Sequence, residues 1–114
     1  MNAQQLSNIR LITEFIQNNL HTRVTAGSLA LKAGMSLSGF RTAFKKEYGL
    51  NVFAFTQQKR MQLAFDLIVA NYLPLKQIAR QCGFKNNSHF SRAIKKQFGT
   101  TPAHIRQQSL RSKK

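Results

Sequence analysis

The sequence predicts an all-α fold of about seven helices, in which one two-helix unit occurs twice. Apolar residues recur at helical spacing through most of the chain, and a glycine follows several of these segments where a helix would end. The segment that begins near Ala30 also recurs about 50 residues later. With 114 residues, of which 42% are hydrophobic, the chain suits a small folded region and not a disordered tail.

The N-terminal segment is predicted as an amphipathic helix from about Gln4 to about Asn19. Its apolar positions are Leu6, Ile9, Ile12, Ile16 and Leu20. Its outward residues are mostly Gln, Asn and Ser, and we assign no binding residue to them. We expect this helix to support the first two-helix unit, with which it makes up residues 1–50.

The first unit contains two predicted helices. Thr25 is a candidate N-cap, Gly34 a candidate helix end, and Ser36 the candidate N-cap of the next helix, at about residues 37–48. Gly39 weakens the first turn of that second helix, because glycine is a poor helix former. The apolar positions of the first helix are Leu29, Ala30 and Ala33. The second helix is expected to point Leu37, Phe40, Phe44 and Tyr48 inward, and Ser38, Arg41, Thr42 and Lys45 outward.

Residues 51–72 are predicted to form a long linker helix between the two units. Asn51 is its candidate N-cap. A helix of some 20 residues spans roughly 30 Å, at about 1.5 Å per residue. Its apolar residues include Phe53, Met61, Ala64, Phe65 and Ile68.

Residues 73–108 contain the second unit. Pro74 begins its first helix, which is a tolerated place because the first helical N–H has no intrahelical partner. Gly83 ends that helix, Asn86 is the N-cap of the next one, and Gly99 closes it. The apolar face of the first helix carries Leu75, Ile78, Ala79 and Cys82. The second helix is expected to point Phe90, Ala93, Ile94 and Phe98 inward, and Asn87, Ser88, Ser91, Arg92 and Lys95 outward.

A last short helix is predicted from Thr101 and Pro102 through about Gln108. It contains His104, Ile105 and Arg106. Residues 109–114 form a basic tail that we expect to be frayed.

Matching positions in the two units indicate a duplication. Gly34 and Gly83 lie 49 positions apart, as do Ala30 and Ala79. The pairs that lie 50 positions apart are Ser36 and Asn86, Phe40 and Phe90, Lys45 and Lys95, Lys46 and Lys96, and Gly49 and Gly99. The second turn therefore holds one extra residue. Two copies are too few for a repeat array, so we interpret them as two helix-turn-helix units.

The charge balance predicts a polyanionic partner. Eighteen Lys and Arg residues face three acidic residues, which gives a formal net charge of +15. The single cysteine, Cys82, excludes an internal disulfide and a thiolate cage for a metal ion, and we expect it to be a small buried hydrophobe. No metal and no cofactor are expected.

No segment approaches the roughly 18 to 20 apolar residues of a membrane span, and the N-terminus does not look like a signal peptide. We therefore expect no membrane contact and a cytoplasmic location.

The outward faces of the two second helices suit the major groove of double-stranded DNA. Arginine pairs bidentately with guanine, asparagine with adenine and serine with either, while lysine meets phosphate. One such helix alone is more simply a solvated polar face, but its repetition favours DNA recognition.

Two other classes of protein fit the sequence less well. A sequence-neutral basic protein that compacts DNA or coats RNA explains the charge, but it does not explain ordered Asn, Ser and Arg residues on matched helix faces. An enzyme is not supported, because no acidic residue pairs with a histidine in a recognisable motif and no glycine loop could hold a phosphate.

The second unit also carries a specific string of residues: Ile78-Ala79, Gly83-Phe84, Ser88, Phe90-Ser91-Arg92, Lys95-Lys96, Phe98-Gly99, Thr101-Pro102 and Arg106. This string resembles the AraC/XylS family of bacterial transcription regulators, and the resemblance covers nearly the whole chain. Ile105 departs from it, because the family usually has an aromatic residue there, and so does the pair Ser38-Gly39. The resemblance implies a sequence-specific DNA-binding regulator on the nucleoid, expected to be an activator with RNA polymerase as a partner.

The resemblance, together with the length of the linker helix, implies that two recognition helices at about residues 37–48 and 87–98 read successive major grooves, about 34 Å apart. The implied base contacts are Ser38, Arg41, Thr42, Asn87, Ser88 and Arg92. The expected contacts with the DNA backbone are Lys45, Lys46, Ser91, Lys95 and Lys96. Lys45 and Lys46 also complement the helix dipole, which is the structural alternative for them. His89 is expected to be a polar contact at the groove edge, and for Arg60 we favour a structural role over a phosphate contact.

Most members of the family carry a separate effector-binding or dimerisation domain, and no such domain fits in this chain. We therefore expect no small-molecule effector site here, whether the chain is a stand-alone regulator or a piece of a longer one.

Overall fold

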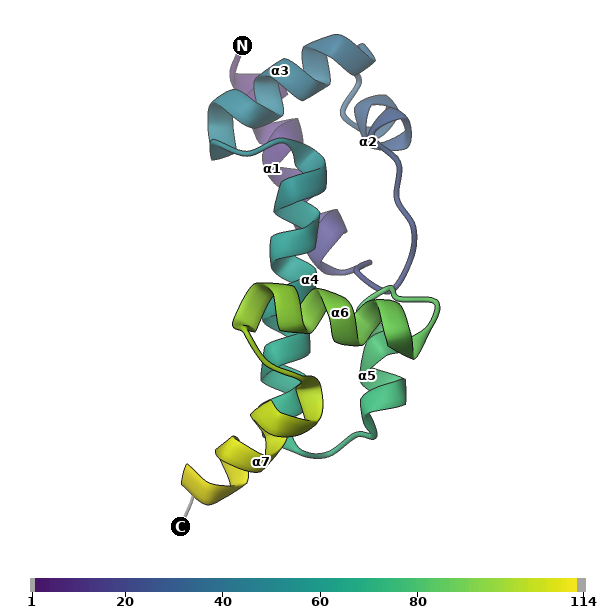
Figure 1. Ribbon diagram of the computed structural model, residues 1–114. Helices are drawn as coiled ribbons and strands as arrows, with labels where there is room; N and C mark the ends of the chain where they lie inside the picture. Colours follow the sequence, from purple (N-terminus) through teal and green to yellow (C-terminus); the bar gives the residue numbers. More distant parts are fainter. Residues whose placement is uncertain (1, 113–114) are drawn as a thin grey trace. The chain divides into compact units, whose positions relative to one another are not determined.

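The computed structural model describes residues 2–112, and these residues form seven α-helices and no strand (Figure 1). The helices are α1 (Ala3–Gln17), α2 (Ala26–Lys32), α3 (Leu37–Tyr48), α4 (Val52–Ala70), α5 (Leu75–Gln81), α6 (Asn87–Phe98) and α7 (Pro102–Ser112). The chain divides into two compact units, residues 1–59 and 60–114, and the boundary falls inside α4. The all-α fold with seven helices confirms the sequence prediction. None of the helices in the described part is long and apolar enough to cross a membrane.

Four helices begin directly after the N-cap residues predicted from the sequence. The side-chain oxygens of Thr25, Ser36, Asn51 and Asn86 each accept a hydrogen bond from a backbone N–H three residues further on, at 3.2, 3.1, 2.8 and 2.9 Å. Each of these bonds satisfies an N–H group that has no partner inside its helix. Asn2 and Gln5 form a capping box at the start of α1, an N-cap beyond those predicted from the sequence.

The turn between the two helices is built in the same way in both units. Gly34 and Gly83 adopt left-handed backbone conformations, with φ of 69° and 84°. In the second unit, the N–H groups of Gly83 and Phe84 donate to the carbonyls of Arg80 and Ala79, at 3.1 and 2.9 Å. The equivalent bonds of the first unit are Gly34 N–H to the Leu31 carbonyl at 3.1 Å and Met35 N–H to the Ala30 carbonyl at 3.0 Å. This bonding pattern ends the first helix sharply and sets the direction in which the chain enters the second.

The core of the first unit brings α1, α2 and α3 together with the start of α4. Its fully buried large residues include Ile9, Ile16, Leu29, Phe40 and Phe44. Phe55 of α4 contacts Phe44 edge-on, with ring centroids 5.2 Å apart, and is 7% exposed. Arg10 of α1 also forms a salt bridge with Glu47 of α3, at 3.7 Å.

Two large apolar residues of the first unit are exposed. Phe53, one of the apolar residues of the predicted linker helix, is 72% exposed. Two residues correspond to about 200° around a helix, and because Phe55 packs on Phe44, Phe53 must point away from the core. Leu37, predicted to point inward, is the first residue of α3 and is 41% exposed.

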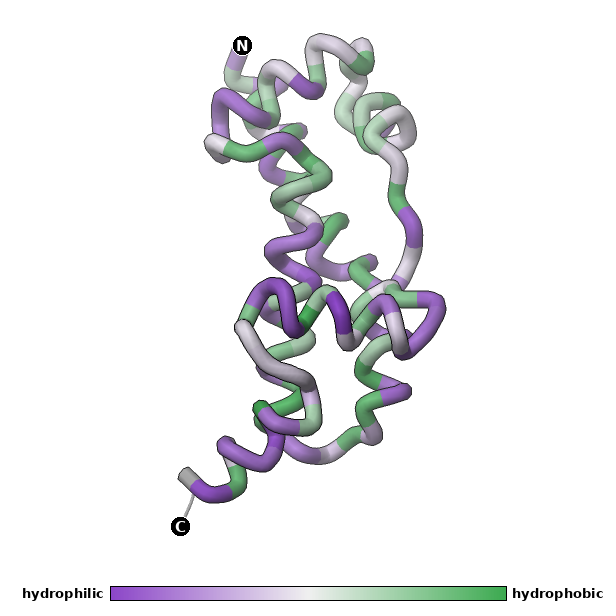
Figure 2. Tube along the Cα trace, viewed as in Figure 1, coloured by the Kyte–Doolittle hydropathy of each residue, from purple (hydrophilic) through white to green (hydrophobic). Residues whose placement is uncertain are grey.

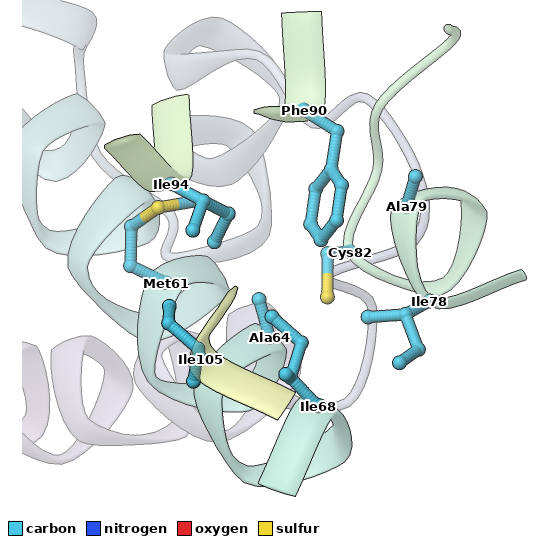
Figure 3. Packing of buried hydrophobic residues seen from close by; sticks show 9 residues of the cluster. All are labelled: Met61, Ala64, Ile68, Ile78, Ala79, Cys82, Phe90, Ile94 and Ile105. Carbon is cyan, nitrogen blue, oxygen red and sulfur yellow. The ribbon is translucent and has the colours of Figure 1, made fainter. Parts of the chain in front are cut away.

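The core of the second unit is drawn from the second half of α4 and from α5, α6 and α7 (Figure 3). Its buried residues are Met61, Ala64, Ile68, Ile78, Ala79, Cys82, Phe90, Ile94 and Ile105. Two aromatic pairs extend it, Phe65 with Phe98 at 5.1 Å and Phe84 with Phe90 at 5.5 Å between centroids. Ile105, which departs from the family pattern, is 7% exposed, so an aliphatic side chain fills this core position.

The last helix, α7, is longer than predicted and is attached to the end of α4. It continues to Ser112, beyond the predicted end near Gln108, so residues 109–112 are helical and not tail. Arg106 Nε donates to the Ile68 carbonyl at 3.1 Å, and Ser109 Oγ lies 3.5 Å from the Val69 carbonyl. Both carbonyls belong to the last turn of α4. Residues 113 and 114 of the predicted tail lie outside the described residues.

Two other predicted boundaries differ slightly. Helix α1 ends at Gln17, with Asn18 as its C-cap, and does not reach Asn19. Pro74 is the N-cap of α5, one position before the first helical residue, Leu75.

Gly34→Ala tests the turn, with Gly27→Ala as its control. An alanine at φ 69° is strained although no atom lies within 4 Å of the added Cβ, so Gly34→Ala should lower the free energy of unfolding by about 1 to 2 kcal/mol. Gly27 lies in α2 with open space around it, and Gly27→Ala should raise that free energy by up to about 1 kcal/mol. Urea unfolding followed by circular dichroism measures both, and equal effects would contradict the assigned turn.

The thiol of Cys82 provides a test of the core of the second unit. It is fully buried, and burial raises the pKa of its thiol to about 11, although the nearby Arg60 charge acts in the opposite direction. Since the unfolded thiol ionises at a lower pH than the folded one, this group's contribution to stability should be complete below about pH 9 and lost as the pH rises toward 11. At pH 8, a thiol reagent should modify the folded chain more than about tenfold more slowly than the urea-unfolded chain. Equal rates would show that the thiol is accessible in the folded state.

Candidate nucleic-acid interface

Helix α6 presents the predicted DNA-binding residues of the second unit on one exposed side. Asn87, Ser88, Arg92, Lys95 and Lys96 are exposed, and Ser91 is half-buried. Ser88, Arg92 and Lys95 follow the i, i+4, i+7 spacing that places side chains along one helix face. Figure 2 shows hydrophilic and hydrophobic residues alternating along this amphipathic helix.

The opposite side of α6 holds the helix in place. Phe90 and Ile94 are 0% exposed and belong to the core of the second unit. The Asn86 cap fixes the start of the helix, and Gly99, with φ of 82°, ends it. A helix fixed at both ends and along its inner face presents its outer side chains from a rigid support, as accurate recognition requires.

Helix α3 has the same organisation in the first unit. Phe40 and Phe44 are 0% exposed on its inner side. The outer side carries the predicted Ser38, Arg41, Thr42, Lys45 and Lys46, all of them exposed. Ser38, Arg41 and Lys45 follow the i, i+3, i+7 spacing of one helix face.

The structure gives a reason for the glycine at position 39 that the sequence did not show. A Cβ atom added at this position would lie 2.9 Å from Ser36 Oγ, the oxygen that accepts the hydrogen bond from the Gly39 N–H. A side chain at position 39 would therefore require the Ser36 cap oxygen to shift. The consequence is that α3 offers no side chain at position 39, whereas the equivalent position of α6 carries His89, which is exposed.

Pairs of lysines stand in the last turn of both recognition helices, Lys45-Lys46 in α3 and Lys95-Lys96 in α6. All four are exposed. Positive charge at a helix C-terminus is favoured by the helix dipole, and exposed lysines can also reach a phosphate. Their position is compatible with both predicted roles.

Arg60 is a residue of α4. It is half-buried, and burial lowers the pKa of its guanidinium, while the nearby Cys82 acts in the opposite direction. Within residues 2–112, no group of three or more His, Cys, Asp or Glu residues is arranged to hold a metal ion.

One concave surface of the first unit was not predicted from the sequence. It lies beside α3 and is lined by Ala26, Arg41, Thr42, Lys45, Asn51, Val52 and Phe53. Two of the predicted base-contacting residues, Arg41 and Thr42, therefore share a surface with the exposed Phe53. An apolar residue just after an N-cap is equally compatible with burial and with exposure, so the sequence held no signal for this arrangement.

Comparisons with known proteins agree with this architecture. A family described as a helix-turn-helix domain matches residues 29–108. The HTH-type transcriptional regulator AlkR of Acinetobacter baylyi is 40% identical over 85 residues, which cover 75% of this chain and 28% of AlkR. The chain thus spans less than a third of the length of that relative.

Two solved structures have the same fold. The C-terminal domain of AraT, a response regulator from Geobacillus stearothermophilus, superposes with a TM-score of 0.81 at 26% identity, covering 89% of this chain and 84% of that domain. A probable AraC family transcriptional regulator from Rhodopseudomonas palustris superposes with a TM-score of 0.73 at 30% identity, covering 90% of this chain and 97% of that structure. With two helix-turn-helix units of matching construction and these relatives, the chain belongs to the AraC/XylS family of transcription regulators.

Proposed function

We propose that this chain binds double-stranded DNA sequence-specifically and regulates transcription, with α3 and α6 each entering a major groove. The observation that carries the proposal is the matched pair of rigid helices, each with an exposed side that holds an arginine and short polar groups. The major groove admits an α-helix, and its base edges present donors and acceptors that such side chains recognise.

Six side chains are proposed to contact bases. On α6, Arg92 pairs with a guanine and Asn87 with an adenine, while the Ser88 hydroxyl bonds to either base. On α3, Arg41 has the longest reach, and Ser38 and Thr42 are shorter. We therefore propose that α6 supplies more of the sequence readout than α3 does.

Five further side chains are proposed to contact the DNA backbone, namely Lys45, Lys46, Ser91, Lys95 and Lys96. Phosphate contacts fix the register of a protein on DNA and carry no sequence information of their own. The formal net charge of +15 attracts the chain to DNA and makes the affinity fall as salt rises.

The two recognition helices are proposed to enter successive major grooves. Helix α4 is a single helix of 19 residues, which corresponds to about 28 Å at 1.5 Å per residue. The major groove returns to the same side of DNA about every 34 Å. One chain could then supply the two recognition helices that many helix-turn-helix proteins obtain by forming a dimer.

The proposal includes a role as an activator that contacts RNA polymerase on the nucleoid, which rests on the family resemblance. The second candidate is a sequence-neutral basic protein, which explains the large positive charge equally well. A measured preference for particular DNA sequences would distinguish the two candidates.

Arg92→Ala and Lys95→Ala provide a matched pair of variants on α6. Arg92→Ala should lose about 1 to 3 kcal/mol of binding free energy on the specific site and relax the preference at one base position. Lys95→Ala should weaken binding to all DNA to a similar extent and reduce the slope of affinity against salt by about one ion. Fluorescence anisotropy with specific and random duplexes measures both, and equal losses on the two duplexes for both variants would contradict the assigned roles.

Selection of duplexes from a random-sequence pool at about 150 mM salt tests the proposed function directly, because phosphate binding alone is much weakened there. We expect two short motifs about one helical turn apart. A single motif would mean that α3 contributes backbone contacts only. Absence of any enriched sequence would favour the sequence-neutral candidate.

A further inference from the structure

Phe53 is an exposed aromatic residue with no structural task that accounts for its exposure. It is 72% exposed, whereas the other eight phenylalanines are buried or half-buried. Phe55, two positions later, already supplies the aromatic side chain that packs on Phe44. A large apolar side chain left in water is favourably buried when a partner covers it.

The surroundings of Phe53 are those of a DNA-binding surface. It lines the concave surface beside α3 together with Arg41, Thr42 and Lys45. Two of these neighbours carry positive charge, and no acidic residue lines the surface. A polyanion is therefore the occupant with complementary charge, and the ring stands next to side chains that are proposed to reach base edges.

The second unit has no ring at the equivalent position. Asn51 caps α4 and Thr101 caps α7, each through a side-chain oxygen that accepts a backbone N–H three residues on, at 2.8 and 3.2 Å. Phe53 and Ala103 are thus each the second residue of their helix, and Ala103 is exposed. The difference falls in the unit whose recognition helix lacks a side chain at Gly39, so an additional contact there would complement a shorter recognition face.

We propose that Phe53 is a specificity-determining residue of the first unit, whose ring packs on the C5-methyl group of a thymine in the half-site read by α3. Apolar side chains, phenylalanine among them, distinguish thymine by contact with this methyl group in the major groove. The inference rests on the proposed function, because it requires α3 to bind DNA.

The test uses the duplex selected from the random pool and three proteins: the unmodified chain, Phe53→Ala and Leu31→Ala. Leu31 is 82% exposed on α2 and does not line the concave surface, so Leu31→Ala controls for the loss of an exposed apolar side chain. Both variants should unfold at the same temperature as the unmodified chain, since neither residue is buried. Phe53→Ala should weaken binding to the selected duplex by about five- to tenfold, and Leu31→Ala should leave it unchanged.

Each thymine in the half-site read by α3 is replaced in turn by deoxyuridine, which lacks only the methyl group. This series identifies the base that the Phe53 ring contacts. At one position, deoxyuridine should weaken binding of the unmodified chain as much as Phe53→Ala does, and it should cause no further loss in Phe53→Ala. A loss for Phe53→Ala that no deoxyuridine reproduces, or a selected first half-site without thymine, would overturn thymine reading in favour of contact with a deoxyribose.

Different results would overturn the role of Phe53 and the proposed DNA-binding function. Unchanged binding by Phe53→Ala, while the unmodified chain still selects its site, would overturn the role of Phe53 alone. No selected site for the unmodified chain would overturn the proposed function itself.

Discussion

The complete burial of two large apolar residues on the inner side of each recognition helix determines what the rest of the molecule can present. Phe40 and Phe44 in α3, and Phe90 and Ile94 in α6, have no exposed surface. Since a helix turns by about 100° per residue, burying these positions decides which side chains face outward. The caps, the glycine turns and the supporting helices α1 and α7 all serve to keep these residues buried. A substitution inside the core would therefore alter the outer face without touching any residue on it.

Most of this architecture could be predicted from the sequence, because local chemistry specifies it. N-cap residues, helix-ending glycines and apolar spacing act over a few residues and leave a readable pattern. The duplication supports each of these predictions, because matching residues such as Gly34 and Gly83 are expected to have the same role in both units, here the end of a helix. The outward positions of α3 and α6 followed from the same spacing, although their contacts with DNA remain predictions.

The errors lie where distant parts of the chain decide the outcome. Phe53 and Phe55 are equally apolar, and only the position of Phe44 selects the one that is buried. Residues 109–112 carry no strong helix signal, but Ser109 and Arg106 bond to the last carbonyls of α4 and so extend α7 beyond its predicted end. Neither of these contacts can be inferred from neighbours in the sequence. Gly39 is different, because its reason is local: a side chain there would press on Ser36 Oγ, the cap oxygen three residues earlier.

The extra residue in the second turn and the unlike outer faces have a consequence for the symmetry of recognition. A dimer of identical subunits has a two-fold axis, so its site reads alike on both strands and it can bind in either orientation. Two unlike recognition helices in one chain have no such axis. A site read by both helices would then be non-palindromic, and the bound protein would point in one direction along the DNA. If both helices read DNA as proposed, this chain alone would distinguish upstream from downstream.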